Sequence, residues 1–136
     1  LALPSSERYN KTLQNAEDIS EASEGLIQFC KNKGLSSHDS TFCGLCVEEI
    51  AVASLQNSIK KVEKKNYSID LRVLHEDGSI TIMLRDNGLH FDPNEWLEMY
   101  ANEDPMRCIG VKYVIRQAKD VHYTSTLGLN VVVIKI

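Results

Sequence analysis

IDLRVLHEDGSITIMLRDNG, residues 69–88, predicts a β-hairpin with one buried face. Apolar side chains alternate with polar ones over residues 69–73 and again over residues 80–84, which is the pattern of half-buried strands. Between the two runs, Asp77-Gly78 is a favoured pair for a tight hairpin turn. Asp86 shares the parity of the apolar residues in the second run, so we expect its carboxylate to point toward the packed layer, where an acid needs a partner.

The segments around this hairpin predict helices and a second hairpin. Apolar residues at three- and four-residue steps predict a helix from Ala16 to Lys33, ended by Gly34, and another from Ser36 or Ser37 to about Lys61. Further elements are expected at Asn94–Ala101 (helix), Ile109–Lys119 (helix), and Val121–Thr126 with Asn130–Ile136 (hairpin). This order favours an α+β fold, a two-layer sandwich with helices on one face of a mixed, mostly antiparallel sheet.

The composition indicates one domain spanning residues 1–136 and argues against nucleic acid as a partner. A chain of 136 residues with 43% hydrophobic residues is the size of one compact domain with one core. The 15 basic and 19 acidic residues give a net charge of −4, without a basic run long enough to follow a phosphate backbone. The densest basic stretch, Lys60 to Lys65, follows a predicted helix, where positive charge suits the helix dipole.

The cysteines and the hydropathy pattern favour a cytoplasmic setting. Cys30, Cys43, Cys46 and Cys108 fall in or beside apolar periodic segments, without the spacing of a secreted disulfide scaffold or a zinc site, so we expect buried thiols. The sequence contains no apolar run of about 20 residues and no signal peptide. Since it starts at Leu1 and not at Met, we also expect that it is a piece of a longer protein.

Three short motifs carry the chemistry of the sequence. They are the adjacent acids in Val47-Glu48-Glu49-Ile50, the run D-N-G-x-x-F-D-P from Asp86 to Pro93, and Cys108-Ile109-Gly110-Val111 at an expected helix start. In this order and spacing they resemble the N, G1 and G2 boxes of the GHKL (Bergerat-fold) ATPases. The D-N-G-x-x-F-D-P form is similar to the anti-sigma-factor serine-kinase branch, and the closing segment resembles ATPase-like domains fused to some bacterial membrane transporters.

The resemblance, which covers the chain from about residue 15 to its end, implies ATP as the cofactor. It assigns adenine recognition to Asp86, with Gly88 allowing close approach and Phe91 completing the box. It assigns phosphate binding to Ile109 and Gly110, because the N–H groups at a helix start attract anions. The earlier glycines of this box are replaced by Arg107 and Cys108, so we expect an altered lid.

The resemblance also assigns the catalytic role of polarising a water or serine hydroxyl to Glu49. The family carries a magnesium-binding Asn four residues after this Glu, but the position is Ala53, and a methyl group cannot bind a metal. Asn57 lies one turn further along the same helix face, about 6 Å along the axis, and could serve only if the metal moved. Because magnesium demands near-ideal octahedral oxygen geometry, we expect no intact metal site and weak or absent catalysis.

Two hypotheses follow. The first is an ATP-binding regulatory domain, resembling anti-sigma-factor serine kinases, whose output is binding or phosphorylating a protein partner. The second is a nucleotide-independent protein-interaction module, a pseudo-kinase on the same fold. A homodimer is compatible with both, and a membrane is expected to be involved only through a fused domain. The histidines at positions 38, 75, 90 and 122 lack ligand spacing and are expected at the surface or in turns.

Overall fold

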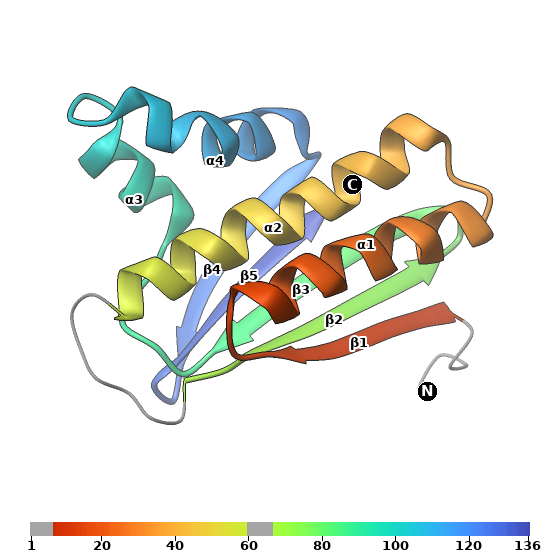
Figure 1. The fold of residues 1–136 in the computed structure, drawn as a ribbon, viewed down its shortest axis with the longest axis horizontal. Coiled ribbons are helices and arrows are strands. Elements are labelled where there is room, and N and C mark those ends of the chain that lie inside the picture. Colours follow the sequence, from red (N-terminus) through yellow and green to blue (C-terminus); the bar gives the residue numbers. More distant parts are fainter. Residues whose placement is uncertain (1–6, 60–66) are drawn as a thin grey trace.

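The computed structural model describes residues 7–59 and 67–136 and forms an α+β sandwich (Figure 1). The elements in chain order are β1 (Arg8–Leu13), α1 (Ala16–Asn32), α2 (Ser37–Ile59), β2 (Ile69–Glu76), β3 (Ser79–Asp86), α3 (Pro93–Tyr100), α4 (Pro105–Gln117), β4 (Asp120–Thr126) and β5 (Leu129–Lys135). The basic stretch Lys60 to Lys65 and the expected helix end at about Lys61 lie outside the described residues.

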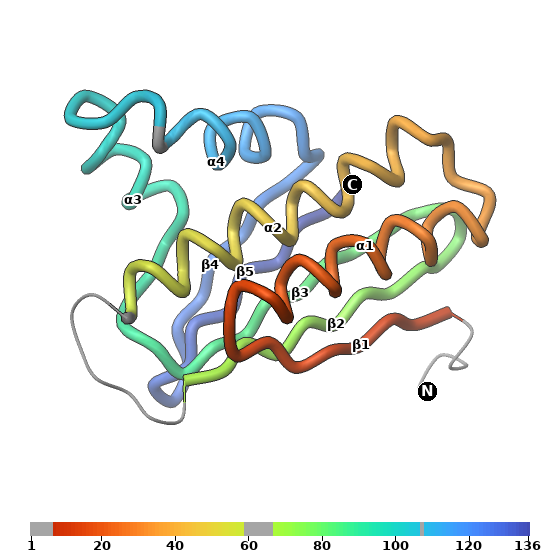
Figure 2. The backbone as a smooth tube through the Cα atoms, viewed as in Figure 1, coloured from red at the N-terminus to blue at the C-terminus, as the bar shows by residue number. Residues whose placement is uncertain are grey.

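The described strands form one five-stranded sheet in the order β1-β2-β3-β5-β4. Each neighbouring pair of described strands is antiparallel, so the predicted two-layer α+β class with a mostly antiparallel sheet is confirmed, and no parallel pair occurs among these strands. Helices α1 and α2 lie across one face of the sheet (Figure 1). In the chain trace, α2 lies between α1 on one side and the α3–α4 pair on the other (Figure 2).

Local capping fixes both ends of α1 and the start of α2. The Asn15 side chain accepts a hydrogen bond from the Asp18 backbone N–H at 2.8 Å and starts α1. Gly34, at φ 88°, follows the C-terminus of α1 in the left-handed conformation that glycine adopts without strain. Ser36 Oγ accepts from the Asp39 N–H at 3.0 Å, which confirms the expected start of the second helix.

The core lies between the helices and the inward face of the sheet. The alternating residues of β2 and β3 are buried as the hairpin pattern predicted, and all four cysteines are buried thiols. Within the described ranges, no helix is long and apolar enough to cross a membrane. The alternation of apolar residues in the sequence thus predicted the buried face of β2 and β3 correctly.

Two elements differ from the sequence expectation. Strand β1 was not predicted, and it pairs with β2 along the edge of the sheet. Helix α4 begins at Pro105, not near Ile109, because proline is well suited to the first position of a helix, where its missing N–H costs nothing. As a result, Gly110 lies inside α4 and not at its start.

Candidate functional site

The candidate site centres on Asp86, the last residue of β3, whose side chain is buried with 4% exposure. Within the described part of the chain, three donors surround its carboxylate. Ser54 Oγ donates to Oδ2 at 2.9 Å, while Asn130 Nδ2 and the Gly88 N–H donate to Oδ1 at 2.9 Å and 2.8 Å. The expectation that this acid points inward and has partners is confirmed.

The α2 side of the site is made of hydroxyl groups. Ser54 Oγ also lies 3.0 Å from the hydroxyl of Tyr67, which is buried just before β2. Burial, and then the charge of Asp86, raise the pKa of Tyr67, so its hydroxyl keeps its proton at neutral pH. One turn further along α2, Ser58 Oγ accepts from the Leu89 N–H at 3.1 Å. The helix therefore holds both the acid and the loop that follows it.

Gly88 has no room for a side chain. A Cβ atom at this position would collide with Ser58 Oγ and with the ring of Tyr67. Glycine is therefore needed so that the loop after β3 can pass against α2. The close approach that the resemblance attributes to this glycine is, in this structure, an approach to the protein's own side chains.

Asn130, near the start of β5, is a site residue that the sequence analysis missed. Its buried amide Nδ2 donates to Leu89 O at 2.6 Å as well as to Asp86, and its Oδ1 accepts from Tyr123 OH at 2.8 Å. The Phe91 N–H points at the same Oδ1 at 3.4 Å. Asn130 thus ties β5 to β3 and to the following loop. Its inward parity, opposite Asp86 in the sheet register, was the available signal.

The loop after Asp86 leads into α3. Phe91 is buried and packs edge-on against Trp96, with ring centroids 6.1 Å apart, so it anchors α3 to the core. Between the end of α2, this loop and α3 lies a cavity of about 80 Å³ lined by residues that include Asn57 and Phe91. Small-molecule sites usually exceed roughly 300 Å³, so a nucleotide entering here requires α3 to move away from α2.

The catalytic and phosphate-binding candidates meet on the other side of α2. Glu49 is half-buried, and burial followed by the charge of Glu48 raises its pKa. Its carboxylate packs directly against Gly110 of α4, where a Cβ atom would collide with it. Along α2, Glu49 lies five residues before Ser54, about 7.5 Å along the axis. The structure therefore brings Glu49 and Gly110 together, at a distance from Asp86.

The expected position of Gly110 at a helix start is wrong. Because Gly110 is in the sixth position of α4, its N–H is within the helical hydrogen-bonding register and not among the open groups of the first turn. The side chain of Ile109 is 54% exposed on the outer surface of α4. The phosphate-binding role that the resemblance implies for Ile109 and Gly110 stays a prediction.

The residues present do not fit magnesium. Ala53 is buried in α2 and carries no oxygen in its side chain. The alternative ligand, Asn57, uses its amide Nδ2 to donate to His90 O at 3.1 Å, which ties the end of α2 to the loop after β3. Among residues 7–59 and 67–136, no group of three or more His, Cys, Asp or Glu side chains is arranged to hold a metal ion.

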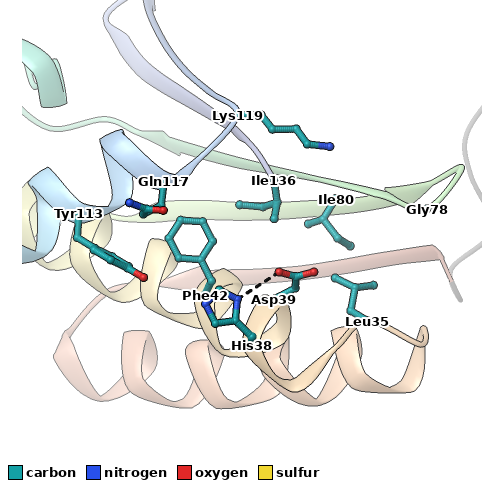
Figure 3. A pocket seen from close by; sticks show the side chains of 10 residues that line it. All are labelled: Leu35, His38, Asp39, Phe42, Gly78, Ile80, Tyr113, Gln117, Lys119 and Ile136. Carbon is teal, nitrogen blue, oxygen red and sulfur yellow. Dashed lines mark hydrogen bonds and ion pairs between the residues drawn. The ribbon is translucent and has the colours of Figure 1, made fainter.

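A second, larger pocket is shown in Figure 3 and includes residues of the first turns of α2. Asp86, in contrast, contacts Ser54 in the second half of that helix. It has a volume of about 280 Å³ and lies between the first turns of α2, the end of α4 and the β2–β3 turn at Gly78. Phe42 and Tyr113 pack edge-on in it, with centroids 5.9 Å apart. None of the sequence-predicted site residues lines this pocket.

Comparison with models of known protein families gives no match, and comparison with curated proteins gives no match either. The resemblance to the GHKL ATPases therefore stays a prediction made from the motif residues.

Proposed function

We propose that this chain is an ATP-binding regulatory domain that resembles the anti-sigma-factor serine kinases and has weak or no catalytic activity. The observation that carries the proposal is the buried Asp86 carboxylate, fixed by donors from α2, β5 and the adjoining loop. A buried acid held as an acceptor at the end of a central strand is what recognition of the adenine amino group requires. The domain would act by binding to a regulatory protein. The buried thiols of the chain suit a reducing cytoplasm.

The Asp86 carboxylate can accept one more hydrogen bond, from a nucleobase. An ionised carboxylate accepts roughly four hydrogen bonds, and the described donors use three of these positions. An amino group of a ligand can fill the remaining position, whereas a carbonyl oxygen there would be repelled. The proposed site thus favours a 6-aminopurine over a 6-oxopurine.

Weak catalysis is supported by the surroundings of Glu49. Ala53 removes the oxygen that a metal would need, and Asn57 is bonded to the His90 carbonyl. The Glu49 carboxylate packs directly against Gly110 of α4, where even a Cβ atom would collide with it. Phosphoryl transfer depends on metal-assisted charge stabilisation, so we expect it to be slow or undetectable.

Calorimetry of ATP binding with and without magnesium tests this proposal. We expect binding by the native chain that magnesium barely changes, and binding that depends on magnesium after Ala53→Asn. Ala53→Leu is the matched control, because it adds a side chain of similar size without an oxygen. A native chain that phosphorylates a partner serine or hydrolyses ATP as fast as enzymes with an intact site would contradict the weak-catalysis part.

A second candidate function is nucleotide-independent docking of a protein partner. It is favoured by the outer surface of α4, where Met106, Ile109 and Tyr113 recur at helical spacing with exposures of 79%, 54% and 42%. A stripe of this kind is typical of a surface that another protein or a second copy covers. Should calorimetry detect no nucleotide binding at millimolar ATP, this docking function replaces the first proposal.

A further inference from the structure

A continuous series of hydrogen bonds connects the surface of α3 to the buried Asp86. Glu95 Oε2 lies 2.8 Å from His90 Nε2, and His90 Nδ1 lies 3.0 Å from Tyr123 OH. Tyr123 OH lies 2.8 Å from Asn130 Oδ1, and Asn130 Nδ2 lies 2.9 Å from Asp86 Oδ1. We call these five residues the relay.

The direction of each proton in the inner half of the relay is fixed by its acceptors. Asp86 Oδ1 and Leu89 O can only accept, so both require the NH₂ group of Asn130. The Oδ1 atom of Asn130 then faces Tyr123, whose hydroxyl must donate to it. A phenol has one proton, so the same hydroxyl oxygen must accept from His90 Nδ1.

The outer half of the relay then requires two protons on His90. Its Nδ1 donates to Tyr123, and its Nε2 faces the Glu95 carboxylate, which accepts. Both bonds exist together only in the imidazolium form. If Nδ1 loses its proton, the Tyr123 hydroxyl turns to donate to His90, and Asn130 Oδ1 keeps only the long 3.4 Å contact with the Phe91 N–H among its described donors.

The surroundings keep Tyr123 a donor while His90 remains open to solvent. Burial raises the pKa of Tyr123, a hydrogen bond with the Ser125 side chain lowers it, and the charges of Asp92, Asp86 and Glu95 raise it. The net shift is upward, so the hydroxyl stays protonated at neutral pH. The His90 side chain is 61% exposed and stacks edge-on against Tyr123. Among the described residues, the charged groups that face His90 are Glu95 of α3 and, in the cavity that His90 lines, Asp92.

We propose that Tyr123 is a positioning residue that orients Asn130 against Asp86, and that the protonation of His90 sets this orientation. The orientation in turn sets the affinity of the base site, by which we mean the position at Asp86 proposed to bind the adenine base. This inference rests on the proposed function, because the affinity concerned is that for an adenine nucleotide. The relay makes the site tighter when His90 is charged and looser when it is neutral. A partner that withdraws Glu95 from His90 would act in the same direction as a rise in pH.

The orientation of Asn130 is tested first without nucleotide, by nuclear magnetic resonance. We expect the side-chain amide signals of Asn130 to shift with the same midpoint as the imidazole signals of His90 when the pH is varied. After Tyr123→Phe, which removes only the hydroxyl, the Asn130 signals no longer follow His90. Asn130 signals that are insensitive to pH in the native chain would overturn the inference, whatever the result with ATP.

Nucleotide affinity is then measured at one pH below and one pH above the midpoint that the imidazole signals of His90 give. For each protein, the ATP affinity at the higher pH is divided by its affinity at the lower pH. We expect this ratio to be roughly three- to tenfold smaller for the native chain than for His90→Gln, a difference of about 0.6–1.4 kcal/mol in binding free energy. The comparison cancels the ionisation of ATP itself. His122→Gln, at an exposed position of β4, is the matched control and should behave as the native chain does.

The two proposals fail in different ways. Equal pH profiles for the native chain and His90→Gln, with measurable ATP binding, overturn the link between His90 and the base site. Absent ATP binding together with coupled titration of His90 and Asn130 removes the proposed function, yet leaves Tyr123 as the residue that orients Asn130.

Discussion

Replacing Asp86 separates its role in the fold from its proposed role in binding. In Asp86→Asn, the oxygen that accepts from Gly88 and Asn130 can stay in place, while the new NH₂ group donates to Ser54, which in turn can donate to Tyr67. Hydrogen bonds to a charged acceptor contribute about 1 kcal/mol more than those to a neutral one. We therefore expect a loss of about 1–2 kcal/mol in the free energy of unfolding.

Asp86→Ala is the contrasting variant. It leaves the Gly88 N–H and one proton of the Asn130 amide buried without an acceptor, at about 1–3 kcal/mol each, so we expect a loss of about 2–6 kcal/mol. Urea unfolding measures both losses. In Asp86→Asn, an N–H meets the adenine amino group, and calorimetry should show ATP binding weakened about 10- to 150-fold, equivalent to about 1.5–3 kcal/mol. Equal destabilisation by the two variants, or unchanged ATP affinity in Asp86→Asn, would refute the reasoning.

Three further substitutions test single features. Gly88→Ala forces a methyl group against the buried ring of Tyr67, and urea unfolding should show a loss of about 1–3 kcal/mol, whereas an unchanged midpoint would mean that the loop moves freely. Glu49→Gln should stabilise the fold near neutral pH, because the pKa of Glu49 is raised in the folded protein. The native chain then loses stability as the pH rises from the pKa of Glu49 in the unfolded chain, about 4.3, through its pKa in the folded protein. A stabilisation by Glu49→Gln that persists below about pH 4 would contradict this cause. Leu127→Asn should raise the free energy of unfolding by up to about 1 kcal/mol, measured by thermal unfolding. Leu127 has φ 53° in a turn where it is 97% exposed, and asparagine adopts this left-handed conformation more readily than leucine. A lower free energy of unfolding would indicate a stabilising contact of this leucine.

The parts of the fold that were predictable are those with strong local patterns. The hairpin of β2 and β3 has clear alternation and a favoured turn pair, and its register places Asp86 opposite Ile69 and Asn130, as its parity required. Helix α1 has both an apolar stripe and caps. These signals are carried by neighbouring residues, so they can be recognised without knowledge of the tertiary structure.

The parts that were missed depend on distant contacts. Strand β1 reads Arg-Tyr-Asn-Lys-Thr-Leu and is largely exposed at the edge of the sheet, so it lacks an apolar alternation. The start of α4 was misplaced because its first two residues, Pro105 and Met106, are exposed and show no apolar pattern, so that only the proline marks it. Asn130 looked like an ordinary turn-flanking residue, because its buried bonds to Leu89 and Asp86 join positions more than 40 residues apart.

The strand order has a consequence for synthesis of the chain. Strand β3 lies between β2 and β5, yet β5 leaves the ribosome only after on the order of 40 further residues have been added. At typical translation rates, this interval lasts on the order of 2–10 seconds. During that time the hydrogen-bonding edge of β3, with its Ile-Thr-Ile-Met-Leu run, has no β5 strand to cover it and can pair with another nascent chain. The central position of β3, which holds Asp86 in the folded domain, thus makes the newly made chain dependent on rapid completion or on a chaperone.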